Sequence, residues 1–186
     1  MLIFRRHLRG FSLIEMMVGL VIVGILLATG LPSIRTWLNN TKIRNAAEAI
    51  QNGLQQARAA AVQHNGLVVF TLGAGSSWTV GCAVVVAGTC PAIIESRSSL
   101  EGSTNVSVAA DQAAITFNGL GRASFVVAGV AKKFVVTMPN GGTCVADGGQ
   151  MRCLNVAVSN GGQIHMCDPA IVFSNTAPQG CTAQEK

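Results

Sequence analysis

The sequence predicts an α+β fold: one long N-terminal helix packed on an antiparallel β-sheet domain. Residues 11–64 join an apolar run to an apolar stripe with helical spacing. The rest of the chain consists of short runs rich in Val, Ile, Phe or Thr, separated by Gly, Asn, Ser or Asp. With 186 residues, the chain is long enough for one such domain and an appendage, but not for two substantial domains.

Composition and charge narrow the class of protein. Hydrophobic residues make up 49% of the chain and charged residues 11%, against a usual charged share of about 25%. This composition excludes an intrinsically disordered chain. The net charge is +5, and three of the 13 basic residues lie in the first ten positions, at Arg5, Arg6 and Arg9. A uniformly basic nucleic-acid-binding protein would carry more charge than this.

The first element is the apolar run at residues 11–31, which follows the basic leader at residues 1–10. At about 1.5 Å per residue, a helix of this length spans about 30 Å, the thickness of a bilayer core. Positive charges before such a run hold that end on the cytoplasmic side of a membrane. The sequence therefore predicts a transmembrane or filament-core helix. The alternative is a signal peptide of about 30 residues, cleaved near Ala28-Thr29-Gly30.

Glu15 is the one charged residue in this run. An ionised carboxylate in the middle of a bilayer costs about 2.5–3.5 kcal/mol even on lenient scales, so a plain anchor would not carry one. One interpretation is that the side chain reaches the membrane interface. The other is a cationic partner, which can be a new α-amine at Phe11, made by cleavage after Gly10, or a group in a neighbouring subunit.

The second half of the predicted helix, residues 32–64, is amphipathic. Pro32 removes a backbone donor and is expected to bend or break the helix locally. Beyond it, apolar residues recur every three or four positions and form one stripe; its members are Ile43, Ala46, Ala47, Ile50, Leu54, Ala57 and Ala61. Asn65-Gly66 provides a C-terminal stop. This half is expected to lie on a folded domain.

Residues 65–186 are predicted to form that domain from short antiparallel strands. The expected strands are residues 67–72, 78–86, 92–97, 106–108, 114–117, 124–127, 133–138, 151–158 and 163–166. The polar tail from residue 175 is expected to be a surface loop or to be partly mobile.

Six cysteines fit an oxidising compartment, on the far side of the membrane from the basic leader. The sequence contains no Cys-x-x-Cys and only three histidines, so it predicts no metal site. Six cysteines allow 15 pairings. The interpretation favoured is pairing of sequence neighbours, and six buried free thiols are the alternative. The favoured pairs are Cys82–Cys90, Cys144–Cys153 and Cys167–Cys181.

No catalytic motif is found. The chain has no Gly-x-Ser-x-Gly, no P-loop and no complete dinucleotide-binding glycine motif. Gly119 and Gly121 are interpreted as turn residues, and Asp111 and Asp147 likewise. The sequence therefore predicts neither an enzyme nor a cofactor.

Residues 9–15, Arg-Gly-Phe-Ser-Leu-Ile-Glu, resemble the class III signal of type IV pilins and pseudopilins. The resemblance implies that a prepilin peptidase cuts after Gly10 and methylates Phe11, and that Glu15 sets the subunit register in a filament. Residues 44–62, residues 115–122 and Cys-Asp-Pro at 167–169 more specifically resemble the GspH/FimT group of minor pilins and pseudopilins.

The resemblance also implies a place and partners. The protein is expected in the bacterial inner membrane as a single-pass protein with a periplasmic domain, and then in a pilus at the cell surface. Its expected partners are prepilin peptidase and other pilins, bound through the N-terminal helix. A minor pilin of the pilus tip or initiation complex is the favoured interpretation, and a type II secretion pseudopilin is the nearest alternative.

DNA binding is a further alternative, because one branch of this group binds DNA through Gly-Arg-x-Arg near its last strand. The matching positions here are Gly162-Gln163-Ile164-His165, which lack both arginines. Phosphate affinity depends on Lys and Arg, so this departure counts against the role. Four other basic residues are the candidate DNA contacts, although scattered solvated charges are the favoured interpretation; they are Arg122, Lys132, Lys133 and Arg152.

Overall fold

The structure is a computed structural model that describes residues 10–124 and 132–186, without the side chains of residues 29–32. Most of the leader and most of the expected strand at 124–127 lie outside the described residues. The chain forms two compact units, Met1–Trp37 and Leu38–Lys186. Helix α1 (Leu13–Gln63) contributes to both and continues through Pro32, so the proline does not end the helix. The predicted helix, residues 11–64, begins two residues earlier and ends one residue later than the observed one.

Among the described residues, no single helix meets both the length and the hydropathy expected of a membrane span. The stretches Leu13–Ala28 and Ser33–Gln63 meet that test only when they are taken together.

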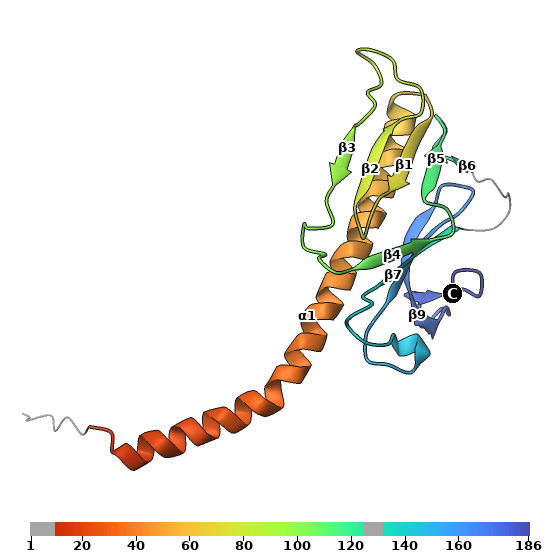
Figure 1. Cartoon of the computed structure of the whole chain (residues 1–186). Coiled ribbons are helices and arrows are strands. Elements are labelled where there is room, and N and C mark those ends of the chain that lie inside the picture. The colour runs from red at the N-terminus through yellow and green to blue at the C-terminus, as the bar shows by residue number, and fades with distance from the viewer. Residues whose placement is uncertain (1–9, 125–131) are drawn as a thin grey trace, which may run out of the picture. The chain divides into compact units, whose positions relative to one another are not determined.

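The second unit contains two five-stranded sheets beside the C-terminal half of α1 (Figure 1). The first sheet has the order β3-β2-β1-β5-β6. Its strands are β1 (Val68–Leu72), β2 (Trp78–Cys82), β3 (Glu95–Arg97), β5 (Ala114–Phe117) and β6 (Ala123–Ser124). All of its neighbouring strands pair antiparallel.

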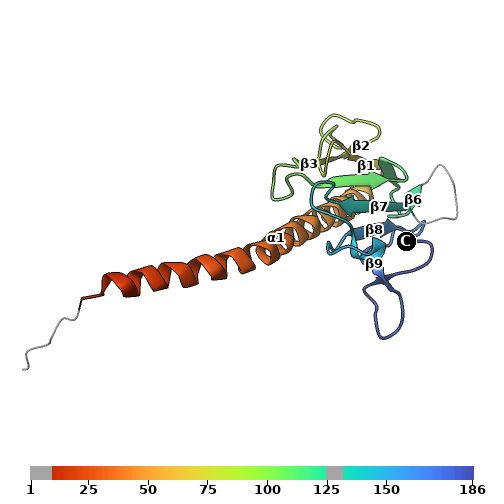
Figure 2. The same ribbon diagram turned by 60° about the horizontal axis from the view of Figure 1, so that its bottom comes forward.

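The second sheet has the order β10-β9-β8-β7-β4, and Figure 2 shows β7, β8 and β9 as neighbours. Its strands are β4 (Ser107–Ala110), β7 (Lys132–Thr137), β8 (Leu154–Val158), β9 (Ile164–Val172) and β10 (Gly180–Cys181). A short 3-10 helix, η1 (Val145–Asp147), precedes β8. The pair β9–β10 is parallel and the others are antiparallel, so the antiparallel α+β prediction is confirmed with one exception.

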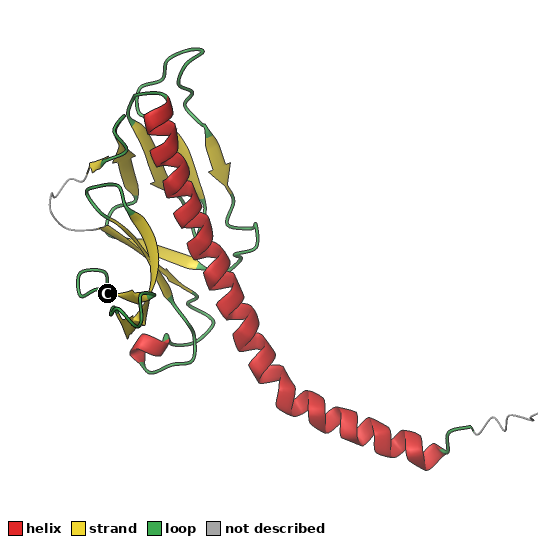
Figure 3. Ribbon diagram, turned by 180° about the vertical axis from the view of Figure 1, so that it is seen from behind, coloured by secondary structure: helices red, strands yellow, loops and turns green. Residues whose placement is uncertain are grey.

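The core lies where the second half of α1 meets the sheets (Figure 3). Every member of the predicted apolar stripe, from Ile43 to Ala61, is fully buried. Phe70 and Phe117 from the first sheet and Phe134 from the second are buried in the same cluster. The rings of Phe70 and Phe134 meet edge to face, with centroids 5.6 Å apart. The helix therefore holds the two sheets together through one shared core.

Gly53 marks a close approach between α1 and the first sheet. A Cβ at this position would lie 2.8 Å from the indole ring of Trp78 and 2.9 Å from the ring of Phe70. Glycine lowers helix stability by about 1 kcal/mol relative to alanine in a helix interior. Here it removes the side chain that would separate the helix from Trp78.

Most expected strands differ from the observed ones by one to three residues at their ends, and two differ by more. The expected strand at 78–86 ends at Cys82, because the disulfide to Cys90 closes residues 83–89 into a loop. The Val86 and Cys90 backbones pair within that loop. The last expected strand, 163–166, extends as β9 to Val172, and β10 was not predicted.

Candidate functional site

The first candidate site is the start of α1, where the predicted processing residues lie. Phe11 is 78% exposed and stands two residues before the helix begins. The Ser12 hydroxyl oxygen accepts the backbone N–H of Glu15 at 3.2 Å, which is N-cap geometry. Glu15 lies in the first turn of the helix, where a carboxylate is favoured by the positive end of the helix dipole. Ser12 was not singled out from the sequence, although Ser-x-x-Glu before an apolar run is a capping signal.

The helix beyond this start is covered by exposed apolar side chains. Leu13, Leu20 and Leu26 are each more than 60% exposed, and the polar residues of the run are few. Monomeric soluble proteins rarely expose apolar patches larger than a few hundred Å². This stretch is therefore an interaction surface. The exposed large apolar residues are Leu13, Ile14, Met16, Met17, Val18, Leu20, Val21, Ile22, Val23, Ile25, Leu26 and Leu27.

The four candidate DNA-contact residues do not gather in one place. Lys132 and Lys133 begin β7, and the β7–β8 register places Arg152 beside the far end of β7. Six residues of strand correspond to about 20 Å at about 3.3 Å per residue. Arg122 lies in the turn before β6, a strand of the other sheet. The Lys133 ammonium donates a hydrogen bond to the backbone oxygen of Lys186.

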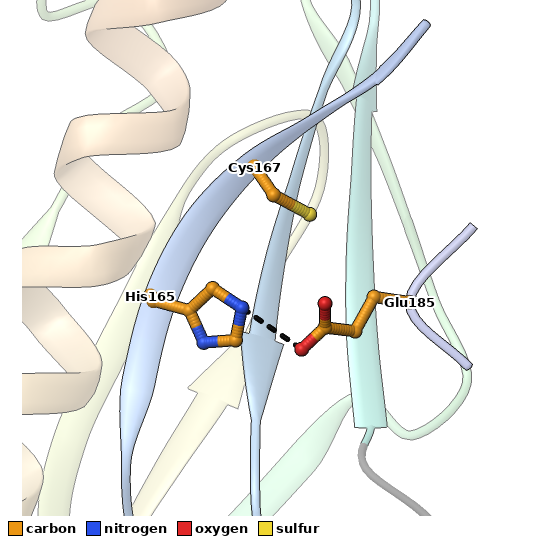
Figure 4. Close-up of side chains that lie close together, drawn as sticks. All are labelled: His165, Cys167 and Glu185. Atoms are coloured by element: carbon orange, nitrogen blue, oxygen red, sulfur yellow. Dashed lines mark ion pairs between the residues drawn. The ribbon is translucent and has the colours of Figure 1, made fainter. Parts of the chain in front are cut away.

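A second candidate site lies where the end of the chain meets β9, and the sequence did not point to it. We call it the C-terminal corner, and it consists of Asn155, His165, Cys167, Cys181 and Glu185. Figure 4 shows three of these side chains close together, with His165 Nε2 2.8 Å from Glu185 Oε1. The imidazole is 44% exposed and the carboxylate side chain is 9% exposed.

Glu185 is held by several contacts in this corner. The backbone N–H of Thr182 donates to Glu185 Oε2 at 2.9 Å, and Asn155 Nδ2 donates to the Glu185 carbonyl at 2.7 Å. Burial by itself raises the pKa of the Glu185 carboxyl, but the hydrogen bonds from Thr182 and the charge and hydrogen bond of His165 outweigh it, so the net pKa is lowered. The predicted polar tail is thus anchored at its end.

Three disulfides are present, between the same sequence neighbours that the sequence analysis favours. They join Cys82 to Cys90, Cys144 to Cys153 and Cys167 to Cys181, with Cα–Cα separations of 5.8, 5.5 and 5.0 Å. The third disulfide belongs to the C-terminal corner and ties β10 to β9. Disulfides are typical of proteins in oxidising compartments.

Two surface hollows show no catalytic chemistry. The larger lies along α1 and is lined by Arg58, Val62, Ala59, Gln55 and Gln63. The smaller lies beside β1, β2 and β3, and Arg97 is the charged residue in its lining. Neither lining contains a histidine, a cysteine or a carboxylate. Neither hollow therefore contains a side chain that could act as the base of a nucleophile–base pair.

Comparison with known proteins adds two sequence matches. Residues 46–162, more than half of the chain, match the family described as type II transport protein GspH. Residues 5–31 match the prokaryotic N-terminal methylation motif. Among curated protein sequences, none matches the chain.

Two solved structures are similar to the chain, both of the type IV minor pilin FimU from Pseudomonas aeruginosa strain PAO1, in space groups P21 and P65. Each is 22% identical in sequence. The first has a TM-score of 0.49 and covers 75% of this chain and 94% of its own. The second has a TM-score of 0.48 and covers 74% of this chain and 98% of its own.

The methylation motif coincides with the capped start of α1 and with its exposed apolar surface. The GspH match covers α1 from Ala46 onward, the whole first sheet, and β4, β7 and β8 of the second sheet. Pilins and pseudopilins are structural proteins rather than enzymes. The chain therefore belongs to the GspH family, as a minor pilin or pseudopilin with an N-terminal methylation motif.

Proposed function

We propose that the chain is cleaved after Gly10 by prepilin peptidase, methylated at Phe11, and assembled through residues 11–31 into a type IV pilus. Before assembly, the same segment anchors the protein in the inner membrane, with residues 65–186 in the periplasm. In the filament, the protein occupies the tip or initiation complex. Its partners are other pilins, which bind the apolar half of α1.

The observation that carries this proposal is the exposed apolar surface that lies within the methylation motif. Leu20, for example, is 72% exposed, whereas Leu54 in the other half of the same helix is fully buried. Exposed apolar surface on this scale is stable only in lipid or against similar surfaces. A helix core shared by many subunits supplies such surfaces, and the inner membrane supplies lipid before assembly.

Glu15 has a specific task within this proposal. Cleavage after Gly10 leaves a positive α-amine on Phe11, next to the positive end of the α1 dipole. A carboxylate in the first turn offsets both charges in its own chain. In a filament, the Glu15 carboxylate also attracts the amine of an adjacent subunit. This attraction sets the position of neighbouring helices relative to each other along the filament axis. In a low-dielectric surrounding, such a pair is strong because the charges are poorly screened.

Intact mass measurement of the membrane-extracted protein tests the processing step. The expected mass is that of residues 11–186 plus one methyl group, with three disulfides. A mass that corresponds to a chain beginning near Leu31 would show a secreted domain without its anchor, and the proposal would fail.

The assembly step is tested with Glu15→Gln, which keeps the shape of the side chain and removes its charge. We expect the variant to be processed and inserted, but recovered in sheared filaments at least tenfold less than wild type. The matched control is Glu48→Gln, because Glu48 lies on α1 in the second unit, where it pairs with Arg44 at 2.8 Å. Equal recovery of Glu15→Gln and wild type would contradict the proposed pair.

Deletion of the gene that encodes this chain distinguishes a pilus protein from a type II secretion protein. Loss of surface pili with normal protein secretion supports the pilus, and the opposite result would assign the chain to the secretion machine. For the tip position, we expect far fewer copies than of the major pilin in sheared filaments. A copy number close to that of the major pilin would exclude it.

A further inference from the structure

The C-terminal corner brings metal-ligating groups together from distant parts of the sequence. One nitrogen of His165, Sγ of Cys167 and a carboxylate oxygen of Glu185 all lie within 4.8 Å of one another. Cys167 is bonded to Cys181, so a second sulfur lies at the same point. Within residues 10–124 and 132–186, no other group of three such side chains is found.

We propose that this corner binds one Zn²⁺ ion when the Cys167–Cys181 disulfide is reduced to two thiols. Zinc is held by thiolate, imidazole and carboxylate groups, usually four of them in tetrahedral geometry. The corner contains one such set, and its members are His165, Cys167, Cys181 and Glu185. The sequence by itself predicts no metal site here, because these residues do not follow the spacing of a common zinc motif.

The donor atoms lie close to the separations that one zinc ion requires. Ligand atoms lie about 2.0–2.3 Å from zinc, so two donors in tetrahedral geometry are about 3.3–3.8 Å apart. The three donor atoms here lie within 4.8 Å of one another, so no pair has to approach by more than about 1.5 Å. The side chains of His165 and Glu185 already point toward each other (Figure 4), and an ion between them would replace their direct contact.

Asn155 provides an independent observation at the same place. Its side chain is 2% exposed, and its Oδ1 atom has no hydrogen-bond partner among the described residues. Asn155 is the register partner of Cys167 on the neighbouring strand, so the two side chains lie on the same face of the sheet. Because Nδ2 donates to the carbonyl of Glu185, rotating the amide would place two oxygens against each other.

A buried acceptor without a donor is costly and calls for a partner. In the reduced chain, before zinc binds, the S–H of Cys167 can donate to Oδ1 of Asn155. The disulfide form has no S–H to offer. The buried oxygen is therefore better satisfied in the reduced form of the corner, which is the form that binds zinc.

Once the two thiols are present, zinc binding requires no oxidant or reductant. Binding of Zn²⁺ displaces one proton from each of Cys167 and Cys181, and two zinc–sulfur bonds form. A chain that has just crossed the membrane carries these thiols before any oxidant acts on it. In that state, zinc would link β9 to β10 as the disulfide does later, and would keep the two thiols from pairing with other cysteines.

The test uses the full chain in detergent micelles. A phosphine reduces each disulfide to two thiols and takes up oxygen from water, and the excess is removed without air. Zinc is then titrated against a chromophoric chelator, and Co²⁺ is added in parallel because cobalt–thiolate bonds give an intense absorption band. We expect one zinc per reduced chain, with sulfur ligation, and no such site in the oxidised chain.

Matched variants separate this corner from general thiol binding. Cys167→Ser with Cys181→Ser should abolish the site, whereas Cys82→Ser with Cys90→Ser should leave it intact. Losing even a group that only orients a metal ligand costs about 10–100-fold in affinity, so His165→Ala and Glu185→Gln should each weaken zinc binding at least tenfold.

Three results would overturn the proposal: no zinc bound by the reduced wild type, zinc retained without Cys167 and Cys181, or unchanged affinity in both His165→Ala and Glu185→Gln. Circular dichroism checks that each variant is folded. Should the double serine variant fail to fold, His165→Ala and Glu185→Gln together still decide the question, since both variants retain the two thiols.

Discussion

The two halves of α1 are one continuous helix with opposite surroundings. In the second half, the stripe from Ile43 to Ala61 is fully buried against the protein's own sheets. In the first half, Leu13–Ala28, the described side chains are exposed on every face. The second half alternates apolar and polar positions, whereas the first is apolar all round apart from a few residues.

This difference shows that the pattern of a helix, rather than its length, indicates where its partner lies. A helix with one apolar stripe finds that partner in its own chain. A helix that is apolar on all faces must be covered by lipid or by other helices. Helix α1 contains both patterns in sequence, so one element serves both as an anchor and as part of a core.

The largest effect is expected from Gly10→Val, which changes the residue before the proposed cleavage point. The larger, branched side chain should block the peptidase, so that nearly all of the protein keeps its leader. Intact mass distinguishes the two forms directly. Mature-length protein in this variant would contradict the assignment of Gly10.

Leucine truncations in the two halves compare them directly. Leu54 is fully buried, so Leu54→Ala should lower the free energy of unfolding of the second unit by about 2–5 kcal/mol. Leu20 is 72% exposed, so Leu20→Ala should change it by less than about 0.5 kcal/mol.

Denaturant unfolding in detergent, followed by Trp78 fluorescence in a Trp37→Phe background, measures both leucine variants. Trp78 is then the one tryptophan left. Similar losses in the two variants would mean that the first half also packs on the domain.

Alanine at two helix glycines is the next comparison. Gly53→Ala gains about 1 kcal/mol of helix propensity but forces a methyl group against Trp78 and Phe70, and overpacking of this kind costs about 1–3 kcal/mol. We expect a net loss of about 1 kcal/mol in the same unfolding assay. Gly24→Ala is the control, because a Cβ there meets nothing within 4 Å. A more stable Gly53→Ala would disprove the close approach.

The smallest effect is expected from the acid response of Glu185. Its pKa in the folded protein lies below its ordinary value of 4.5, so it adds stability above that value. That contribution is lost as the pH falls through the folded pKa. Glu185→Gln should therefore lower the Tm of the oxidised protein at neutral pH, with a penalty that shrinks as the pH falls below 4.5. A penalty independent of pH would show that the charge of Glu185 contributes nothing.

The sequence identified the helix and its buried stripe because both follow from a local period of 3.6 residues. It also indicated most strands, since β-rich runs and turn residues alternate along the chain. It did not reveal that residues 83–86 leave β2, or that β10 pairs with β9. Those features depend on a disulfide and on a parallel pairing between separate segments.

The amino-acid sequence by itself determined which half of α1 must be covered by lipid or by other chains, because hydrophobic patterning along one helix is a local property. Only the tertiary structure decided that Gly53 lies under Trp78, and that Asn155, Cys167 and Glu185 share one corner. These groups meet because strand register and the return of the chain end bring distant residues together. No local spacing encodes such a meeting, since many registers are compatible with the same alternation of apolar and polar residues.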